Sequence, residues 1–206
     1  MSLDERLAAG LEQMGLSLSK AQRDRLLSYI ALLQKWNKVY NLTAVRDPEN
    51  MLYQHLLDSL AVLPYVGEGR LLDVGSGAGL PGIPLAIVRP ELQITLLDSN
   101  HKKTTFLRQA CIELELSKVE VECVRVDTYA PPQLFDAVIS RAFSDLSEFV
   151  RLSAHLCRPG GTLLAMKGVY PHDELAQLPG EFRQVEVVSL NVPGLEAQLH
   201  LVIIRV

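Results

Sequence analysis

LLDVGSGAGLPG, at residues 71–82, joins a short apolar run to a loop that has glycines at alternate positions. The apolar run predicts a buried strand that ends in Asp73, and Pro81 opens the helical run IPLAIV, because proline suits the first turn of a helix. The loop glycines are Gly75, Gly77 and Gly79. Glycine leaves no Cβ between main-chain N–H groups and a ligand, and a helix N-terminus supplies further free N–H groups. A strand, a glycine loop and a helix in this order therefore predict a ligand-binding loop.

Two cofactors bind to loops of this kind. For a dinucleotide, Gly77, Gly79 and Gly82 spell G-x-G-x-x-G, and Asp98 follows Gly79 by 19 residues, where an acidic residue binds a ribose. For S-adenosylmethionine the pattern is D-x-G-x-G-x-G, and Asp73 can face the positively charged methionine part. An anion gains nothing beside a pyrophosphate, so Asp73 favours S-adenosylmethionine. The remaining alternative is a tight turn without a ligand, which leaves the entropy cost of three glycines unexplained.

Composition indicates an ordinary globular protein. The chain has 206 residues, 48% hydrophobic and 21% charged, which suits one main domain with a small addition. No apolar run approaches the about 20 residues that span a membrane, and the acidic N-terminus does not resemble a signal peptide. Three widely spaced cysteines, Cys111, Cys123 and Cys157, predict reduced thiols in a cytoplasmic protein without a metal site. A net charge of −4 argues against indiscriminate nucleic-acid binding but permits a local basic face.

The pattern of apolar residues predicts two regions, a helical extension at 1–66 and an α/β domain at 67–206. In the extension, we expect Ser19 to cap a long helix that ends near Asn37. We expect a second helix to start at Asp47 and Pro48. Strands of the domain are expected near 70–74, 93–98, 119–125, 134–140 and 162–167, with a turn at Pro159-Gly160-Gly161. Two later strands, 182–190 and 199–206, are so close together that they must be antiparallel. We therefore predict a Rossmann-like methyltransferase fold, with a mostly parallel seven-stranded sheet, a C-terminal antiparallel hairpin and helices on both faces.

Ligands of open α/β sheets bind beyond the carboxyl ends of the strands, so the residues that follow each predicted strand are candidates. Asp98 can accept hydrogen bonds from ribose hydroxyls or cap the next helix. Val126 can pack on the adenine ring. Asp127 can accept a hydrogen bond from the adenine amino group, or it can be a solvated acidic residue of a loop. Arg141 and Lys167 end apolar strands, where an unpaired charge is costly, so they need a ligand or an ion pair. The carboxylates considered for that ion pair are Asp73, Asp98 and Asp127.

The end of the fourth strand lacks two motifs of other methyltransferases. It has neither the N/D-P-P-Y motif of amino-group methyltransferases nor a Pro-Cys dipeptide for attack on carbon-5 of a pyrimidine. Guanine N7 carries no proton at neutral pH, so its methylation needs no general base and depends on alignment with the sulfonium methyl. The missing motifs allow this acceptor without selecting it.

Seven segments spread over nearly the whole chain carry a family resemblance. They are WNKVYNLTAVRD (36–47), HLLDSL (55–60), LLDVGSGAGLPGIPLAI (71–87), LLDS (96–99), VISRAF (138–143), LLAMKG (163–168) and HLVII (200–204). Through them the chain resembles the bacterial ribosomal RNA small subunit methyltransferase G family, also called glucose-inhibited division protein B. The resemblance implies a cytoplasmic enzyme that uses S-adenosylmethionine to methylate N7 of one guanine of 16S rRNA, guanine 527 in the usual numbering, within ribosomal particles. It also implies cofactor contacts at Gly75, Leu80, Val126, Asp127 and Arg141, although the family often has Glu at position 127.

The candidate site combines these arguments. The expected cofactor-binding residues are Asp73, Gly75, Gly77, Gly79, Leu80, Asp98, Val126, Asp127 and Arg141, and the expected catalytic residues are Arg141 and Lys167. If the extension touches RNA, the expected phosphate contacts are Lys35, Lys38, Arg46 and His55.

Other roles are open for the same block. Trp36 can be a core residue, His55 can bond Asp58 on the same helix, and the polar residues of the turn can serve only as caps, namely Asn37, Asn41 and Thr43. No long apolar edge or heptad occurs, so we expect a monomer. We also expect neither a membrane nor DNA as a partner. A small-molecule methyltransferase and an NAD-dependent oxidoreductase remain as alternative functions.

Overall fold

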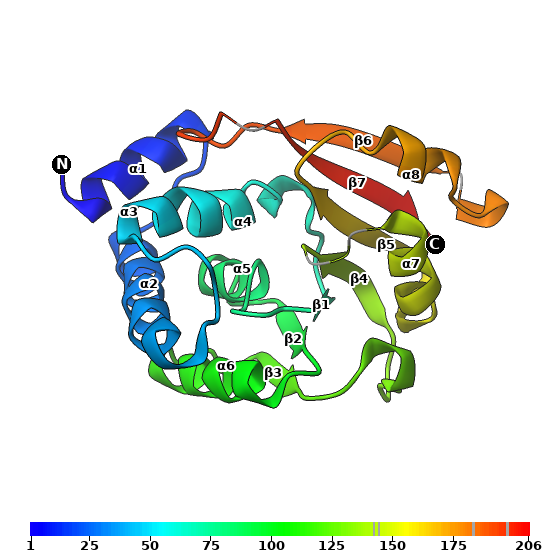
Figure 1. The fold of residues 1–206 in the computed structure, drawn as a ribbon, viewed down its shortest axis with the longest axis horizontal. Coiled ribbons are helices and arrows are strands. Elements are labelled where there is room, and N and C mark those ends of the chain that lie inside the picture. Colours follow the sequence, from blue (N-terminus) through cyan, green and yellow to red (C-terminus); the bar gives the residue numbers. More distant parts are fainter. Residues whose placement is uncertain (142, 144, 183, 197) are drawn as a thin grey trace.

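The fold is a single seven-stranded sheet covered by helices on both faces (Figure 1). The computed structural model describes residues 1–141, 143, 145–182, 184–196 and 198–206. Its strands are β1 (Arg70–Val74), β2 (Gln93–Leu97), β3 (Val119–Glu122), β4 (Phe135–Ser140), β5 (Cys157–Lys167), β6 (Val185–Leu190) and β7 (Leu199–Arg205). Their order is β3-β2-β1-β4-β5-β7-β6, with β1 to β5 parallel and β7 antiparallel to both its neighbours. The predicted parallel sheet with a terminal hairpin is confirmed.

Helices α1, α2, α3, α6 and α7 begin at a side-chain cap, whereas α4, α5 and α8 do not. They are α1 (Leu3–Gln13), α2 (Lys20–Tyr40), α3 (Pro48–Met51), α4 (Asp58–Leu60), α5 (Gly82–Val88), α6 (His101–Glu113), α7 (Leu146–Ser153) and α8 (His172–Ala176). A π-helical segment, Leu52–Leu57, joins α3 to α4, and we call it the π turn. Short 3₁₀ turns occur at Leu63–Tyr65, Val126–Thr128, Ala154–Leu156 and Gly180–Phe182. The side chain of Ser19 caps α2 and that of Asp47 caps α3, as predicted.

Several boundaries differ from the prediction. Helix α2 runs on to Tyr40, where Asn41 adopts a left-handed conformation that ends it. The predicted turn at 159–161 is wrong, because these residues lie inside β5 and the Gly160 N–H donates to the Val206 carbonyl at 2.7 Å. Strand β6 starts at residue 185 because 180–182 form a 3₁₀ turn instead. Helix α5 starts at Gly82, one residue after the predicted proline.

The hydrophobic core has two parts, one on each face of the sheet. Successive residues of a strand point to opposite faces, and accordingly Leu71 belongs to the first cluster and Leu72 to the second. The first cluster unites the N-terminal helices with α5 and α6, and the second contains the apolar face of α7. The extension at 1–66 thus shares one core with the sheet, and the boundary at residue 66 stays a prediction. No helix within the described ranges is long and apolar enough to cross a membrane.

Candidate functional site

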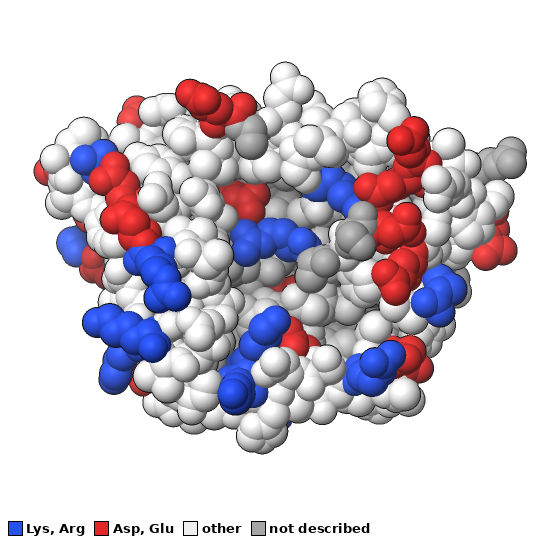
Figure 2. All heavy atoms as spheres, viewed as in Figure 1, with Lys and Arg blue, Asp and Glu red and all other residues white. Residues whose placement is uncertain are grey.

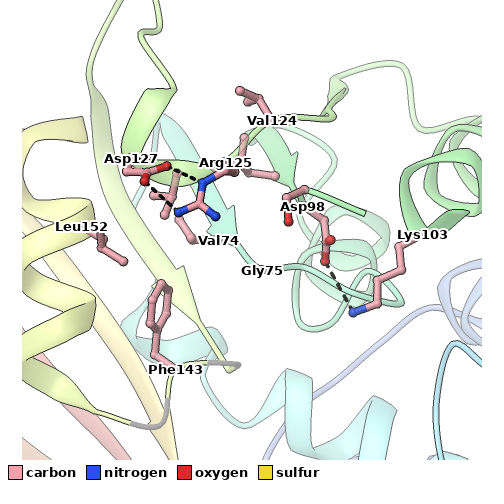
Figure 3. A pocket seen from close by; sticks show the side chains of 12 residues that line it. Val74, Gly75, Asp98, Lys103, Val124, Arg125, Asp127, Phe143 and Leu152 are labelled. Carbon is pink, nitrogen blue, oxygen red and sulfur yellow. Dashed lines mark hydrogen bonds and ion pairs between the residues drawn. The ribbon is translucent and has the colours of Figure 1, made fainter. Parts of the chain in front are cut away.

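A cavity of about 300 Å³ lies at the carboxyl ends of β1, β2 and β3 (Figure 3). Its size is that of a small-molecule pocket. Its walls are Val74, Gly75, Leu97, Asp98, Ser99, Lys103, Val124, Arg125, Val126, Asp127, Phe143 and Leu152. Four of the predicted cofactor-binding residues line it, namely Gly75, Asp98, Val126 and Asp127. The other predicted site residues, including the catalytic candidates Arg141 and Lys167, are not among its walls.

Asp73 lies beneath the glycine loop and is fully buried. Its Oδ2 atom accepts a hydrogen bond from the Gly82 N–H at 2.8 Å, which ties the end of β1 to the start of α5. Its Oδ1 atom is buried without a partner among the described residues. Burial raises the pKa of Asp73 from 3.8 to about 7. A ligand donor or a cationic ligand near Oδ1 would satisfy this orphaned oxygen and favour its ionised form.

The glycine loop needs glycine for conformation and for packing. Gly77 and Gly79 have positive φ values of 58° and 90°, a region that other residues rarely adopt. A Cβ on Gly79 would overlap Ile83, and a Cβ on Gly82 would lie 2.7 Å from Asp73 Oδ2. Leu80, which the resemblance assigned to the cofactor, is buried in the first core cluster. These close approaches hold the loop against the sheet. The N–H groups of the three loop glycines are bonded within the protein and are not bare for a ligand: they donate to the Leu97 carbonyl, Asp98 Oδ2 and the Ser76 carbonyl, respectively.

Asp98 joins the glycine loop to the end of β2. Its Oδ2 atom accepts from the Gly77 N–H at 2.9 Å and its Oδ1 atom accepts from the Asn100 N–H at 2.8 Å. The cap of α6 is Asn100 itself, whose side chain accepts from the N–H groups of Lys102 and Lys103. Asp98 is therefore not the helix cap that the sequence offered as an alternative. Each carboxylate oxygen can accept a further bond, so ribose hydroxyls remain possible donors.

Val126 and Asp127 occupy the 3₁₀ turn at the far wall of the cavity. Asp127 pairs with Arg125 at 2.9 Å, and that guanidinium lowers the pKa of the carboxyl. Figure 3 shows this pair on one wall, while Asp98 and Lys103 lie on another and Phe143 faces them from below. An apolar side chain beside an exposed carboxylate is a suitable wall for a purine ring.

The two predicted catalytic cations have partners that sequence reasoning missed. Arg141 Nη1 donates to Asp58 Oδ2 at 2.8 Å and to the Gln54 carbonyl at 3.0 Å. Lys167 Nζ lies 2.7 Å from Glu174 Oε2 and donates to the Phe143 carbonyl at 3.3 Å. The carboxylates suggested from the sequence as ion-pair partners were therefore wrong. Nothing local in the sequence marks Asp58 or Glu174 as their replacements.

The N-terminal cations fall into two groups. Lys35, Lys38 and Arg46 are exposed, and Figure 2 shows Lys and Arg side chains gathered over α2, opposite an acidic surface over α7 and α8. His55 is buried, its Nε2 atom lies 2.9 Å from Thr43 Oγ1, and burial lowers its pKa to about 4. A buried, neutral imidazole cannot supply the phosphate contact that the sequence suggested. The bond proposed between His55 and Asp58 is also wrong, because Asp58 pairs with Arg141.

The other residues of this block are structural. The ring of Trp36 stacks on Tyr40 with centroids 5.2 Å apart and packs against Phe106 of α6 at 5.8 Å. Asn37 is buried and bonds Thr43 through both its amide nitrogen and its oxygen, each at 2.9 Å. Their expected roles in core packing and turn formation are confirmed.

Metal and disulfide chemistry receive no support from the described residues. They contain no group of three or more His, Cys, Asp or Glu side chains that could hold a metal ion. The thiols of Cys111, Cys123 and Cys157 form no disulfide with one another, and Cys157 is buried while Cys111 and Cys123 are partly exposed, so only Cys157 lies fully in the core.

The family profile and the curated relatives that match this chain carry the same name. A family profile described as rRNA small subunit methyltransferase G matches residues 22–202. A protein named Ribosomal RNA small subunit methyltransferase G from Laribacter hongkongensis is 58% identical over 202 residues, which are 98% of each chain. Its namesake from Neisseria gonorrhoeae is 54% identical over 205 residues, 99% of each chain.

Solved structures resemble the fold at lower identity. A SAM-dependent methyltransferase from Aquifex aeolicus gives a TM-score of 0.59 at 19% identity, covering 84% of this chain and 97% of that one. A predicted O-methyltransferase from Agrobacterium tumefaciens gives 0.59 at 23% identity, covering 72% and 78% of the two chains. These structures establish the fold alone.

Proposed function

This chain belongs to the rRNA small subunit methyltransferase G family, and from that premise we propose that it methylates N7 of one guanine of 16S rRNA. The methyl donor is S-adenosylmethionine, and the target is guanine 527 in the usual numbering. The observation that carries the proposal is a cavity bounded by the glycine loop and by carboxylates that follow two neighbouring strands, in a chain of this family.

The residues around the cavity fit S-adenosylmethionine. When bound, this cofactor supplies a methyl group on a positively charged sulfur. Asp98 would accept hydrogen bonds from the ribose hydroxyls, and Val126 would pack on the adenine ring. Asp127 would accept a hydrogen bond from the adenine amino group. The orphaned Oδ1 of Asp73 would stabilise positive charge through a donor or a water, since a buried carboxylate interacts strongly with nearby charge. A dinucleotide pyrophosphate would instead meet repulsion from this carboxylate.

The chain's own task in the reaction is alignment. Guanine N7 offers a lone pair without a proton, so no residue has to act as a general base. Arg141 and Lys167 are proposed to fix the acceptor and the cofactor in line, which supplies much of the acceleration in such transfers. Within the described residues, Arg141 uses only Nη1 for its hydrogen bonds to protein, which leaves its Nε and Nη2 donors for a ligand.

The exposed cations beside α2 suit the RNA backbone. Lys35, Lys38 and Arg46 would each contact a phosphate, and such contacts weaken with salt. His55 is omitted from this surface because it is buried. With the small ribosomal subunit as substrate, the proposed site of action is the cytoplasm, and the proposed state of the enzyme is a monomer.

Labelled S-adenosylmethionine tests the proposal directly. Purified protein should transfer label to one guanine of 16S rRNA in undermethylated 30S subunits. Label on small metabolites with none on rRNA would overturn the proposal in favour of a small-molecule methyltransferase. Calorimetry separates the cofactors, because S-adenosylhomocysteine should bind and NADH should not.

A further inference from the structure

The π turn leaves one carbonyl outside the regular ladder of helical hydrogen bonds. In an α-helix the N–H of residue 58 would donate to the carbonyl of residue 54. Here the Asp58 N–H donates to the carbonyls of Tyr53 and His55, on either side of Gln54. The Gln54 carbonyl accepts instead from Arg141 Nη1 at 3.0 Å. Single π turns within helices occur frequently at functional sites, so this one is a candidate device.

The same segment supplies a second acceptor to the same nitrogen. Asp58 Oδ2 lies 2.8 Å from Arg141 Nη1, and the Asp58 side chain is only 12% exposed. Two acceptors on one nitrogen fix the plane of a guanidinium better than a single flexible contact does. Burial raises the pKa of Asp58, while the Arg141 charge and hydrogen bond act in the opposite direction. The Asp58–Arg141 pair is therefore a partly buried ion pair and not a solvated one on the surface.

The π turn is itself held on several sides. Leu52, Leu56 and Leu57 are fully buried in the first core cluster. On its other side, His55 contacts Thr43 in the loop that also carries Arg46. The two acceptors of Arg141 therefore belong to a well-packed segment. A site that holds a side chain in one orientation requires such packing.

We infer that Asp58 and the Gln54 carbonyl are positioning groups that hold the Arg141 guanidinium for contact with the cofactor or the guanine. This inference rests on the proposed function, which makes Arg141 a catalytic residue. Nη1 donates to the N-terminal segment, and Nε and Nη2 make no hydrogen bond to the described residues, so these two donors are the ones we assign to the ligand. Neither Asp58 nor the π turn touches a reacting atom; both act through Arg141.

The alternative is that the pair only fastens the helices to the sheet. A fastening role predicts that loss of Asp58 lowers stability and leaves the folded enzyme fully active. A positioning role predicts that the folded variant binds or turns over substrate poorly, and that the defect disappears when Arg141 is already absent. These outcomes differ, so kinetics on folded protein decide between them.

The experiment compares Asp58→Ala and Asp58→Asn with Glu49→Ala, which breaks the Arg6–Glu49 ion pair of 2.7 Å on the same helical segment. Folding is checked by circular dichroism and urea titration, and activity is measured at temperatures where every variant is folded. Asp58→Ala should lower kcat/KM for 30S subunits by about ten- to one-hundredfold, the range for lost hydrogen bonds to a charged group. Asp58→Asn keeps one acceptor oxygen and should fall between Asp58→Ala and wild type. Glu49→Ala should stay within about twofold of wild type, as for a surface pair.

Two further measurements make the result decisive. In an Arg141→Ala background, Asp58→Asn should lower kcat/KM no further, because Asp58 affects the reaction only through Arg141. Additive losses, or wild-type kcat, KM and cofactor affinity in folded Asp58 variants, would overturn the inference. Calorimetry with S-adenosylhomocysteine keeps the two proposals apart. If wild-type protein labels no rRNA, the proposed function fails, while a cofactor affinity that falls in Asp58→Ala and not in Glu49→Ala still supports positioning of Arg141.

Discussion

Gly82→Ala tests whether the glycine loop is held by its close packing on β1 and β2. The added methyl would overlap Leu96 Cδ2 and lie 2.7 Å from Asp73 Oδ2, both in the buried interior. Overpacking of this kind costs about 1–3 kcal/mol. Moving the Asp73 carboxylate away from the Gly82 N–H, now 2.8 Å away, costs about 1–3 kcal/mol more. We expect the free energy of unfolding to fall by about 2–6 kcal/mol.

Urea denaturation followed by circular dichroism measures this loss, and thermal unfolding should show it as about 2–4 °C per kcal/mol. Calorimetry should show weaker binding of S-adenosylhomocysteine, because the glycine loop, which holds Asp98 through the Gly77 N–H, moves with α5. The matched control is Gly168→Ala, since a Cβ there meets no atom within 4 Å. That control should change stability by less than about 0.5 kcal/mol. Equal stability of Gly82→Ala and wild type would refute the packing argument.

Three further perturbations test the site. Asp98→Ala should weaken binding of S-adenosylhomocysteine by about 1–3 kcal/mol in calorimetry, and unchanged affinity would remove Asp98 from the site. Burial raises the pKa of Asp73 from 3.8 to about 7, so the fold favours the protonated acid and this contribution to stability is lost as pH rises through that range. Urea titrations at pH 5 and pH 8 should show wild type losing about 3 kcal/mol relative to Asp73→Asn, and parallel curves would contradict this. Replacing the exposed N-terminal cations by alanine should lower the slope of log affinity for 30S subunits against log salt by about 2–3. These cations are Lys35, Lys38 and Arg46. Lys20→Ala, at the other end of α2, should leave the slope unchanged.

Much of the fold could be predicted because its signals are local. The caps of α2 and α3 are polar side chains next to helical runs, and both bond the expected backbone N–H groups. The strands alternate with apolar helices, which restricts the sheet to a few arrangements. The hairpin of β6 and β7 followed from the short connection between them. In each case the residues that decide the structure are close together in the sequence.

Non-local pairing explains where prediction failed. A Pro-Gly-Gly tripeptide ordinarily marks a turn, yet residues 159–161 belong to β5. The backbone of this region bonds to the C-terminus, where the Val206 N–H donates to the Gly161 carbonyl at 3.1 Å. A partner so far along the chain has no local signature. The π turn was missed for a different reason: Leu52, Leu56 and Leu60 follow the four-residue spacing of an ordinary helix.

The N-terminal helices have contacts that the sequence did not predict. The sequence suggested RNA contacts for them, and the structure shows in addition that they bond residues at two strand ends. The hydroxyl of Tyr29 in α2 is buried and donates to the Ala78 carbonyl of the glycine loop at 2.7 Å. The π turn and Asp58 hold Arg141 at the end of β4. Contacts from one helical unit therefore reach the first and fourth strand ends together. Because both contacts join residues far apart in the sequence, no local pattern predicted that the glycine loop and Arg141 are both held by the N-terminal helices.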